Sequence, residues 1–392
     1  MREVVIVSAN RTAIARSPKG SLRQTRPDDF ASHVISGALR RANNFDPARV
    51  EDVIFGCAQP ELEQGLNVAR VAALRAGLPA SVPGLTVNRF CASGLEAIAI
   101  AAQRIACGSA DIIIAGGVES MTMVSFMGET TRPNPSLMTT RPDTYLGMGL
   151  CVEQLAKQYG VTREQSDAFA VTSHDKALDA IASGRFVDEI EPISVTLETM
   201  DADGKLEITT KMFDQDEGPR PGTSTETLAN LKNAFMPDGV ITAGNASQRS
   251  DGASALLLMT SEMAAQHNLT PLLRFVGYAV AADVPENFGI GPAITIPKVL
   301  KQTGISLDQI DLIEFNEAFA AQVLCSDLKF PLPMDRMNVN GGAIALGHPL
   351  GCTGARQTTT LAYEMDRRKS KYGLVTMCAA LGMGAAAIFQ RP

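Results

Sequence analysis

The sequence contains no tryptophan, only four histidines, and no Cys-x-x-Cys pair among its seven cysteines. An odd number of scattered cysteines argues against a disulfide framework and a zinc site, and it predicts reduced thiols in a cytoplasmic setting. The net charge is −7, and no run of lysine and arginine interleaves with aromatic residues. A nucleic-acid-binding role is therefore not supported.

Long apolar runs are also missing. No run reaches the roughly 18 residues that a membrane helix needs, and the apolar part of the N-terminal segment, residues 4–9, is too short for a signal peptide. The sequence ends in Phe-Gln-Arg-Pro rather than in a peroxisomal tripeptide. We therefore expect a cytoplasmic protein without a membrane span.

The composition is that of an ordinary globular protein, with 45% hydrophobic and 20% charged residues. A chain of 392 residues exceeds one hydrophobic core, which predicts two or three folding units. Strand-like runs at 4–9, 52–58 and 111–118 alternate with helical patterns such as 28–42. This alternation predicts an α/β layered fold with a mainly parallel sheet.

A similar order of elements returns late in the chain. Residues 298–318 repeat the plan of residues 37–58: a helix, a short turn, an acidic helical start and an apolar strand. Residues 373–389 then end the chain much as 111–121 close the first part. Two α/β halves with a pseudo-twofold relation explain this repetition better than one long sheet.

The segment 119–249 differs in character, being rich in methionine, proline, threonine and charged turns. Loops of this length in compact proteins are usually functional or have structure of their own. We therefore predict an inserted loop or lid domain at 119–249. It separates an N-terminal half of residues 1–118, completed by about 250–270, from a C-terminal half of residues 271–392.

Cys91 lies between a strand-like run and a helical pattern in which apolar residues recur every three or four positions, from Leu95 to Ile105. The helix is expected to start within two residues of Cys91, so that free backbone N–H groups and the helix dipole favour the thiolate. The alternative is a plain core residue, since free cysteine is among the most buried residue types.

A cysteine nucleophile needs a base, because an unperturbed thiol is only a few per cent ionised at neutral pH. Of the four histidines, His33, His174 and His267 have sequence surroundings typical of surface or capping residues. His348 lies in a glycine-rich loop that leads into a helix, where a ligand could approach the backbone closely. The loop matches neither a P-loop nor a dinucleotide fingerprint, although such loops often serve packing alone.

Two further residues are placed at strand ends. Cys378 follows an apolar run at the point where small residues take over. Asn316 follows another such run, where its amide could orient a water or donate to an oxyanion. Capping of the next helix is an equally good explanation for Asn316.

Six stretches together resemble the thiolase family of acyl-CoA C-acyltransferases, and they occur in family order along the whole chain. They are NRFCASGLEA, GGVESM, TAGNASQRSDGAS, NEAFAAQ, NVNGGAIALGHPLGCTGAR and CAALGMG. The resemblance implies a thiolase fold, in which two similar α/β halves form a five-layered αβαβα core with an inserted loop domain. It also implies assembly as dimers or tetramers, with homotetramer as our prediction.

The resemblance further implies a role for each reactive residue. Cys91 would take the acyl group as a thioester, His348 would activate it, and Cys378 would move protons at the α-carbon. Asn316 would help to form one oxyanion hole through a water beside His348, and the backbone N–H groups of Cys91 and Ala380 would form the other. Coenzyme A is the expected co-substrate; no permanently bound cofactor and no metal are expected.

Two positions depart from the family pattern. Ala380 replaces the usual glycine, which puts its backbone donor in doubt unless the local dihedral angles suit alanine. Gly147 stands where the biosynthetic acetoacetyl-CoA branch has a histidine, which favours the degradative 3-ketoacyl-CoA type. The prediction is thus thiolytic cleavage of 3-ketoacyl-CoA to acetyl-CoA and a shortened acyl-CoA.

The same resemblance assigns Met148, Phe235, Ser247 and Phe319 to the pantetheine or acyl pocket and Arg220 to the nucleotide end of CoA. Core packing or a solvated surface is the alternative for each. Three other functions remain open: an acetyl-CoA C-acetyltransferase, an acyl-CoA-binding relative without turnover, and the partner-dependent subunit of a fatty-acid oxidation complex.

Overall fold

The structure is a computed structural model that describes residues 2–125, 132–201 and 203–392. Most of its strands join one sheet of ten strands, and β6 and β7 form a separate hairpin. The strands are β1 (Val4–Arg11), β2 (Ala15–Arg16), β3 (Asp52–Gly56), β4 (Gly84–Val87), β5 (Ile112–Ser120), β6 (Ile193–Met200), β7 (Leu206–Phe213), β8 (Ser250–Thr260), β9 (Leu273–Ala282), β10 (Leu312–Phe315), β11 (Tyr372–Ala379) and β12 (Met383–Gln390). The helices are α1 (Pro27–Arg41), α2 (Val68–Arg75), α3 (Ser93–Ala106), α4 (Pro135–Thr140), α5 (Met148–Tyr159), α6 (Arg163–Ala182), α7 (Thr225–Ala229), α8 (Ser261–Gln266), α9 (Gly291–Thr303), α10 (Ala320–Lys329), α11 (Ala343–Leu346) and α12 (Thr353–Arg368).

The two halves repeat the same pairing scheme, which confirms the predicted duplication. In the first half β3 pairs with β5 in parallel, β5 pairs with β8 and β8 with β1, the last two antiparallel. In the second half β10, β11, β12 and β9 pair in the same senses and in the same order. Even β4, which extends β3, has a remnant in the second half: a single parallel bridge from Met337 to Ile313.

The prediction of a mainly parallel sheet was wrong. The sheet is mixed. The strand–helix alternation that suggested parallel pairing holds for β3, β4 and β5 of the first half, and these strands are only part of that half. β11 and β12 are joined by a tight turn and are therefore antiparallel. β8 follows the long insertion and also runs antiparallel to its neighbours.

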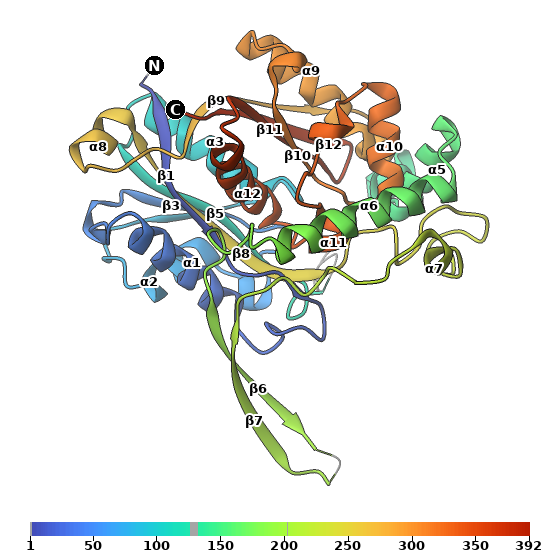
Figure 1. Cartoon of the computed structure of the whole chain (residues 1–392), viewed down its shortest axis with the longest axis horizontal. Helices are drawn as coiled ribbons and strands as arrows, with labels where there is room; N and C mark the ends of the chain where they lie inside the picture. The colour runs from blue at the N-terminus through green and yellow to red at the C-terminus, as the bar shows by residue number, and fades with distance from the viewer. Residues whose placement is uncertain (1, 126–131, 202) are drawn as a thin grey trace.

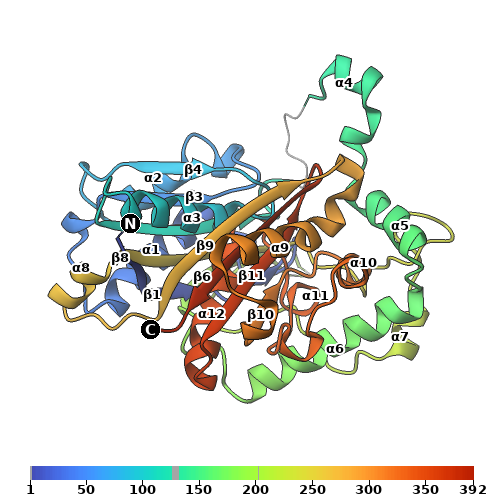
Figure 2. The same cartoon turned by 90° about the horizontal axis from the view of Figure 1, so that it is seen from above.

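The sequence favoured two halves over one long sheet, and this expectation needs correction, since the structure has both. β1 pairs with β9 through Val5↔Arg274 and Ile6↔Leu273, so the hydrogen-bonded ladder continues from one half into the other. Seen from above, the first half, blue to cyan, lies beside the orange-to-red second half, and β9 crosses between them (Figure 2).

The central layer consists of α3 and α12, which pack against each other and against strands of both halves. Glycines allow this close approach: a Cβ at Gly94 in α3 would lie only 2.7 Å from the carbonyl oxygen of Gly351. Helices α1 and α2 cover the outer face of the first half, and α9 covers that of the second half, with α10 packed beside it. These elements make the five layers that were predicted.

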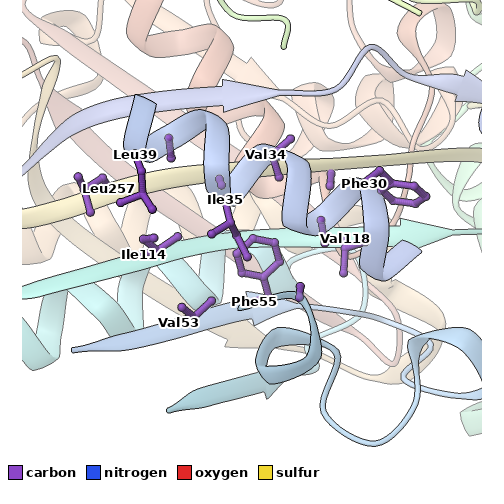
Figure 3. Close-up of a cluster of buried hydrophobic side chains, with 14 of the residues drawn as sticks. Phe30, Val34, Ile35, Leu39, Val53, Phe55, Ile114, Val118 and Leu257 are labelled. Carbon is purple, nitrogen blue, oxygen red and sulfur yellow. The ribbon is translucent and has the colours of Figure 1, made fainter. Parts of the chain in front are cut away.

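Helix α1 shows how the outer layers are held. Its apolar residues Phe30, Val34, Ile35 and Leu39 recur on one face and point toward strand residues of the first half (Figure 3). The strand residues that they face are Val53, Phe55, Ile114, Val118 and Leu257.

The insertion lies between the end of β5 at Ser120 and the start of β8 at Ser250. It contains α4 to α7 and the β6–β7 hairpin, which projects from the body of the protein (Figure 1). The sequence suggested only a charged, turn-rich segment where β7 forms. Its treatment as a separate domain with boundaries at 119 and 249 stays a prediction. Among the described residues, no helix is both long and apolar enough to cross a membrane.

Candidate active site

Cys91 lies in a tight turn between β4 and α3, where the sequence predicted a thiol at a helix start. Phe90, just before it, has a φ of +49°, a left-handed conformation that bulky side chains rarely adopt. The side chain of Asn88 accepts a hydrogen bond from Phe90 N at 2.8 Å, and Ser93 Oγ accepts one from Arg89 N at 2.8 Å. A strained φ persists only where neighbouring contacts stabilise it. These hydrogen bonds therefore fix the turn that positions Cys91.

The helix start does not make Cys91 a thiolate by itself, and this corrects the sequence expectation. Burial raises the pKa of the Cys91 thiol to about 12; its own backbone N–H acts in the opposite direction and the Glu119 carboxylate adds to the rise. Desolvation therefore outweighs the effect of the backbone N–H on the pKa of Cys91. A base is needed to remove the proton.

His348 is a buried imidazole whose two nitrogens both have partners. Nδ1 lies 2.6 Å from Thr353 Oγ1, and Nε2 lies 3.2 Å from the side-chain nitrogen of Asn316. Burial, helped by the charge of Arg356, lowers the pKa of His348 to about 3. The ring is therefore neutral at physiological pH, the state in which a histidine can accept a proton.

The other histidines were expected at surface or capping positions, and His267 and His174 differ in this respect. His267 caps the C-terminal end of α8, as predicted for one of them. His174 is buried rather than exposed, which corrects that prediction: its Nδ1 accepts a hydrogen bond from Arg220 N at 3.2 Å. Burial lowers the pKa of His174 to about 4.

Asn316 follows β10 directly and does not cap the next helix, because α10 begins at Ala320 with Phe319 as its N-cap residue. The capping alternative is therefore excluded. Asn316 is fully buried; its nitrogen reaches His348, and its side-chain oxygen has no hydrogen-bond partner. A free buried acceptor next to a base marks a place for a water or a substrate group.

Cys378 lies near the end of β11 and is completely buried. Burial raises the pKa of the Cys378 thiol, and the nearby thiol of Cys91 raises that pKa further. Ala380 follows in the turn to β12. Its φ is not positive; the left-handed positions in this turn are Leu381, at +62°, and Gly382, at +81°. Alanine therefore fits at 380 without backbone strain.

A cavity of about 380 Å³ opens at Cys91. Ala380 and Met148 line it too, together with apolar side chains from both halves and from the insertion. These include Tyr145, Leu146, Phe288, Leu350 and Leu381. Gly147 also lines it, and a Cβ there would meet no atom within 4 Å. The sequence singled out Cys91, Ala380, Met148 and Gly147 but missed the apolar lining residues just named, since no local pattern distinguishes them from core.

The other predicted CoA contacts lie outside the lining of that cavity. Arg220 and Ser247 line a second cavity of about 380 Å³, where Arg16, Lys19 and Arg249 add positive charge. Phe235 packs edge-to-face on Phe319, with ring centroids 6.1 Å apart. Segments 246–247 and 318–319 are hydrogen-bonded, with Ser247 N donating to Ala318 O at 3.0 Å.

Glu119 is a site residue whose importance the sequence did not reveal, although it lies in one of the quoted motifs. Its buried carboxylate accepts hydrogen bonds from Ala58 N at 2.8 Å, Gln64 Nε2 at 2.8 Å and Gly351 N at 2.7 Å. Ala58 lines the cavity, Gln64 ends a short 3-10 turn at Leu62–Gln64, and Gly351 belongs to the loop of His348. One side chain thus ties together three segments around Cys91.

The structure brings several predicted site residues close together. Asn316 contacts His348; Leu350, two residues after His348, packs in one apolar cluster with Cys91; and Cys91 lies near enough to Cys378 to raise the pKa of that thiol. Their joint action on one substrate carbon stays a prediction. Of the reactive residues, only Cys91 lines the apolar cavity; His348, Cys378 and Asn316 are buried behind its lining. A thiol that opens on such a cavity suits acyl transfer through a covalent intermediate.

Comparison with known proteins agrees with this geometry. Residues 4–262 match the family model of the thiolase N-terminal domain, and residues 269–391 match that of the C-terminal domain. The chain is 49% identical over 390 residues to a 3-ketoacyl-CoA thiolase of Bacillus subtilis and 45% identical over 396 residues to one of Vibrio vulnificus, with full coverage of all chains.

Solved structures give the same result. The human mitochondrial 3-ketoacyl-CoA thiolase matches with a TM-score of 0.89 and 36% identity, covering 100% of this chain and 99% of that one. The acetyl-CoA acetyltransferase of Bacillus anthracis matches with a TM-score of 0.89 and 38% identity at the same coverage. The chain therefore belongs to the thiolase family.

Proposed function

We propose that the protein is a 3-ketoacyl-CoA thiolase, an acetyl-CoA C-acyltransferase that cleaves 3-ketoacyl-CoA with free CoA. The observation that carries this proposal is the opening of an apolar cavity directly at the buried, turn-presented thiol of Cys91. Full-length relatives named 3-ketoacyl-CoA thiolase support the substrate class.

In the proposed reaction, Nε2 of His348 takes the Cys91 proton and the sulfur attacks the 3-keto carbon. The bond between C2 and C3 then breaks: the acyl group stays on sulfur as a thioester, and the electron pair goes to the acetyl-CoA enolate. Cys378 supplies the proton that converts the enolate to acetyl-CoA. The Cys378 thiolate takes the proton of a new CoA thiol, and the CoA sulfur attacks the thioester. The bond from the acyl carbon to Cys91 sulfur breaks, the shortened acyl-CoA leaves, and His348 returns its proton to Cys91.

Two oxyanions need stabilisation along this path. We assign one to Asn316 and His348 and the other to the backbone N–H groups of Cys91 and Ala380. The second assignment is supported because Ala380 and Cys91 line the same cavity and because Ala380 has no left-handed strain.

Coenzyme A is the co-substrate in this proposal, and a solved relative, the human mitochondrial 3-ketoacyl-CoA thiolase, is described in complex with it. We place its nucleotide phosphates at Arg220 beside Arg16, Lys19 and Arg249, since phosphate binding needs convergent positive charge. Ser247, Phe235 and Phe319 are proposed to contact the pantetheine chain, with Met148 at the acyl group.

An acetyl-CoA C-acetyltransferase is the second candidate, supported by the similar Bacillus anthracis structure. The open space beside Gly147 favours longer acyl chains. Rates measured with 3-ketoacyl-CoA substrates of increasing length separate the two. Loss of all activity beyond four carbons would favour the acetyltransferase.

Mass spectrometry tests the main proposal. Incubation with acyl-CoA is expected to add one acyl group on Cys91, and free CoA is expected to remove it. The Cys91→Ser variant should show no adduct, whereas Cys107→Ser, which changes an exposed thiol, should behave like the unchanged protein. An acyl-CoA-binding relative without turnover would bind substrate but show no adduct.

We also propose that the protein is cytoplasmic and forms a homo-oligomer. β4 lies at the edge of the sheet, and Leu62, Leu66 and Leu74 expose apolar side chains on the same half. Unpaired strand edges and exposed apolar groups are typical of interfaces. Light scattering would distinguish dimer from the predicted tetramer, and co-purification would detect a fatty-acid oxidation partner.

A further inference from the structure

Thr353 is a buried residue in the first turn of α12, five positions after His348. Its hydroxyl oxygen lies 2.6 Å from Nδ1 of the imidazole. The same hydroxyl donates to the carbonyl oxygen of Pro349 at 2.9 Å. Neither the sequence nor the family comparison gives this residue a role.

The two contacts together determine where the imidazole carries its proton. A hydroxyl has a single hydrogen, and the Pro349 carbonyl can only accept. Because Thr353 donates that hydrogen to Pro349, its oxygen must accept from Nδ1–H of His348.

The contact at Nε2, the other ring nitrogen of His348, indicates the same tautomer. The side-chain nitrogen of Asn316 lies 3.2 Å from Nε2. An amide nitrogen donates, so Nε2 must be the unprotonated acceptor. Both neighbours of the ring therefore favour the tautomer with hydrogen on Nδ1.

We propose that Thr353 is a positioning residue that holds His348 in the Nδ1–H tautomer, so that Nε2 is the unprotonated nitrogen and takes the Cys91 proton once the thiol replaces the Asn316 amide as its donor. The hydrogen bond at one ring nitrogen selects the tautomer and the orientation of the other. Thr353 remains a suitable acceptor after Nε2 is protonated, because both nitrogens of an imidazolium donate. The base role rests on the proposed function, whereas the tautomer itself does not.

The first experiment needs no variant. The protein is labelled with ¹⁵N-histidine, and the ring nitrogen shifts are measured by NMR near pH 7. Only four histidines contribute, and the His348→Asn spectrum identifies the signals of His348. Protonated Nδ1 and unprotonated Nε2 are expected; protonation at Nε2 instead would overturn the proposal.

The second experiment compares Thr353→Val with Thr358→Val. Both residues are fully buried threonines of α12, and each donates a hydrogen bond to the carbonyl four residues earlier. Of these two threonines, Thr353 contacts His348 and Thr358 does not. Thr353→Val is expected to slow formation of the Cys91 acyl adduct about 10- to 100-fold, the range typical of residues that orient a functional histidine.

The matched variant Thr358→Val is expected to keep the rate within about threefold of the unchanged protein. Thr353→Ser, which retains a hydroxyl, should recover most of the rate lost in Thr353→Val. If Thr353→Val does not fold, Thr353→Ala replaces it. Equal losses in the variants at 353 and 358, with an unchanged ring spectrum, would show that Thr353 serves packing only.

The two proposals fail in distinguishable ways. If the protein is not a thiolase, no variant and no unchanged protein forms an acyl adduct, yet the ring spectrum still reports the tautomer and its dependence on Thr353. If the protein is a thiolase but Thr353 has no positioning role, adducts form and the spectrum of His348 is the same with and without the hydroxyl.

Discussion

The carboxylate of Glu119 accepts a hydrogen bond from the backbone N–H of Gly351 at 2.7 Å, which fastens the end of β5 to the loop of His348. The same carboxylate holds Ala58 N and the side chain of Gln64. Because it is completely buried, none of these donors can turn to water instead.

Glu119→Gln is therefore expected to destabilise the protein by about 2 kcal/mol or more, because an amide nitrogen would face backbone donors in either orientation. Urea unfolding followed by circular dichroism measures the loss. Glu198→Gln, at an exposed position of the β6–β7 hairpin, is the control and should change stability by less than about 0.5 kcal/mol. Equal stability of the two variants would contradict this account.

Cys378→Ala should separate the two half-reactions. Without the second thiol, exchange of the acetyl-CoA methyl protons with D₂O is expected to fall at least about 100-fold, the usual contribution of an acid–base group. Acylation of Cys91 should continue. Cys325→Ala changes another buried cysteine, in α10, and should leave the exchange intact. Exchange at the normal rate in Cys378→Ala would exclude its assigned role.

His348 should make the protein less stable in acid. Its pKa is about 3 in the folded protein against 6.5 when unfolded, so only the unfolded chain takes up a proton between these values. The contribution of the neutral His348 ring to the free energy of unfolding is fully present above pH 6.5 and is lost as pH falls toward 3. Between pH 7 and 4 the loss is about 3 kcal/mol.

The His348→Asn variant lacks this titration and is the comparison for that measurement. Its free energy of unfolding, taken from urea denaturation at pH 7 and pH 4, should fall by about 3 kcal/mol less than that of the unchanged protein. An identical fall in both proteins would mean that His348 is not buried as a neutral ring.

Gly147→Trp is expected to shorten the range of accepted acyl chains. The glycine lines the cavity at Cys91, and nothing lies within 4 Å of the point where a Cβ would be. Its φ of −60° suits any residue. A bulky ring should reduce cleavage of long substrates at least about tenfold relative to short ones, since each lost methylene contact is worth roughly 1 kcal/mol.

Gly147→Ala is the matched control, because a single methyl group has room there. Its chain-length profile should follow that of the unchanged protein. A profile that stays the same in Gly147→Trp as well would place the acyl chain elsewhere.

Local signals predicted the elements around the site well. The spacing from Leu95 to Ile105 located α3, and the patterns at 28–42 and 52–58 located α1 and β3. The repeat of that plan at 298–318 located the end of α9 and β10. These predictions succeeded because they depend on periodicity within one element. The four reactive residues could be proposed individually, since each follows a strand or lies in a glycine-rich loop.

What the sequence could not supply depends on distant partners. The pairing of β1 with β9 joins residues about 270 positions apart, and no local pattern announces it. The high pKa of Cys91 follows from burial that only the folded layers create. Thr353 and Glu119 lie in two of the quoted motifs, but the motifs do not show what these side chains do, because their importance comes from the atoms that they face.

The tight contact between α3 and α12 has a further consequence. The nucleophile stands at the start of one of these helices and the base just before the other, and the glycines at 94 and 351 leave no slack between them. Substitutions that separate α3 from α12 would displace the two reactive groups from each other. Substitutions in the projecting hairpin β6–β7 would not have this effect. Among such proteins, sequence differences should therefore be frequent at the periphery and rare at the contact between α3 and α12.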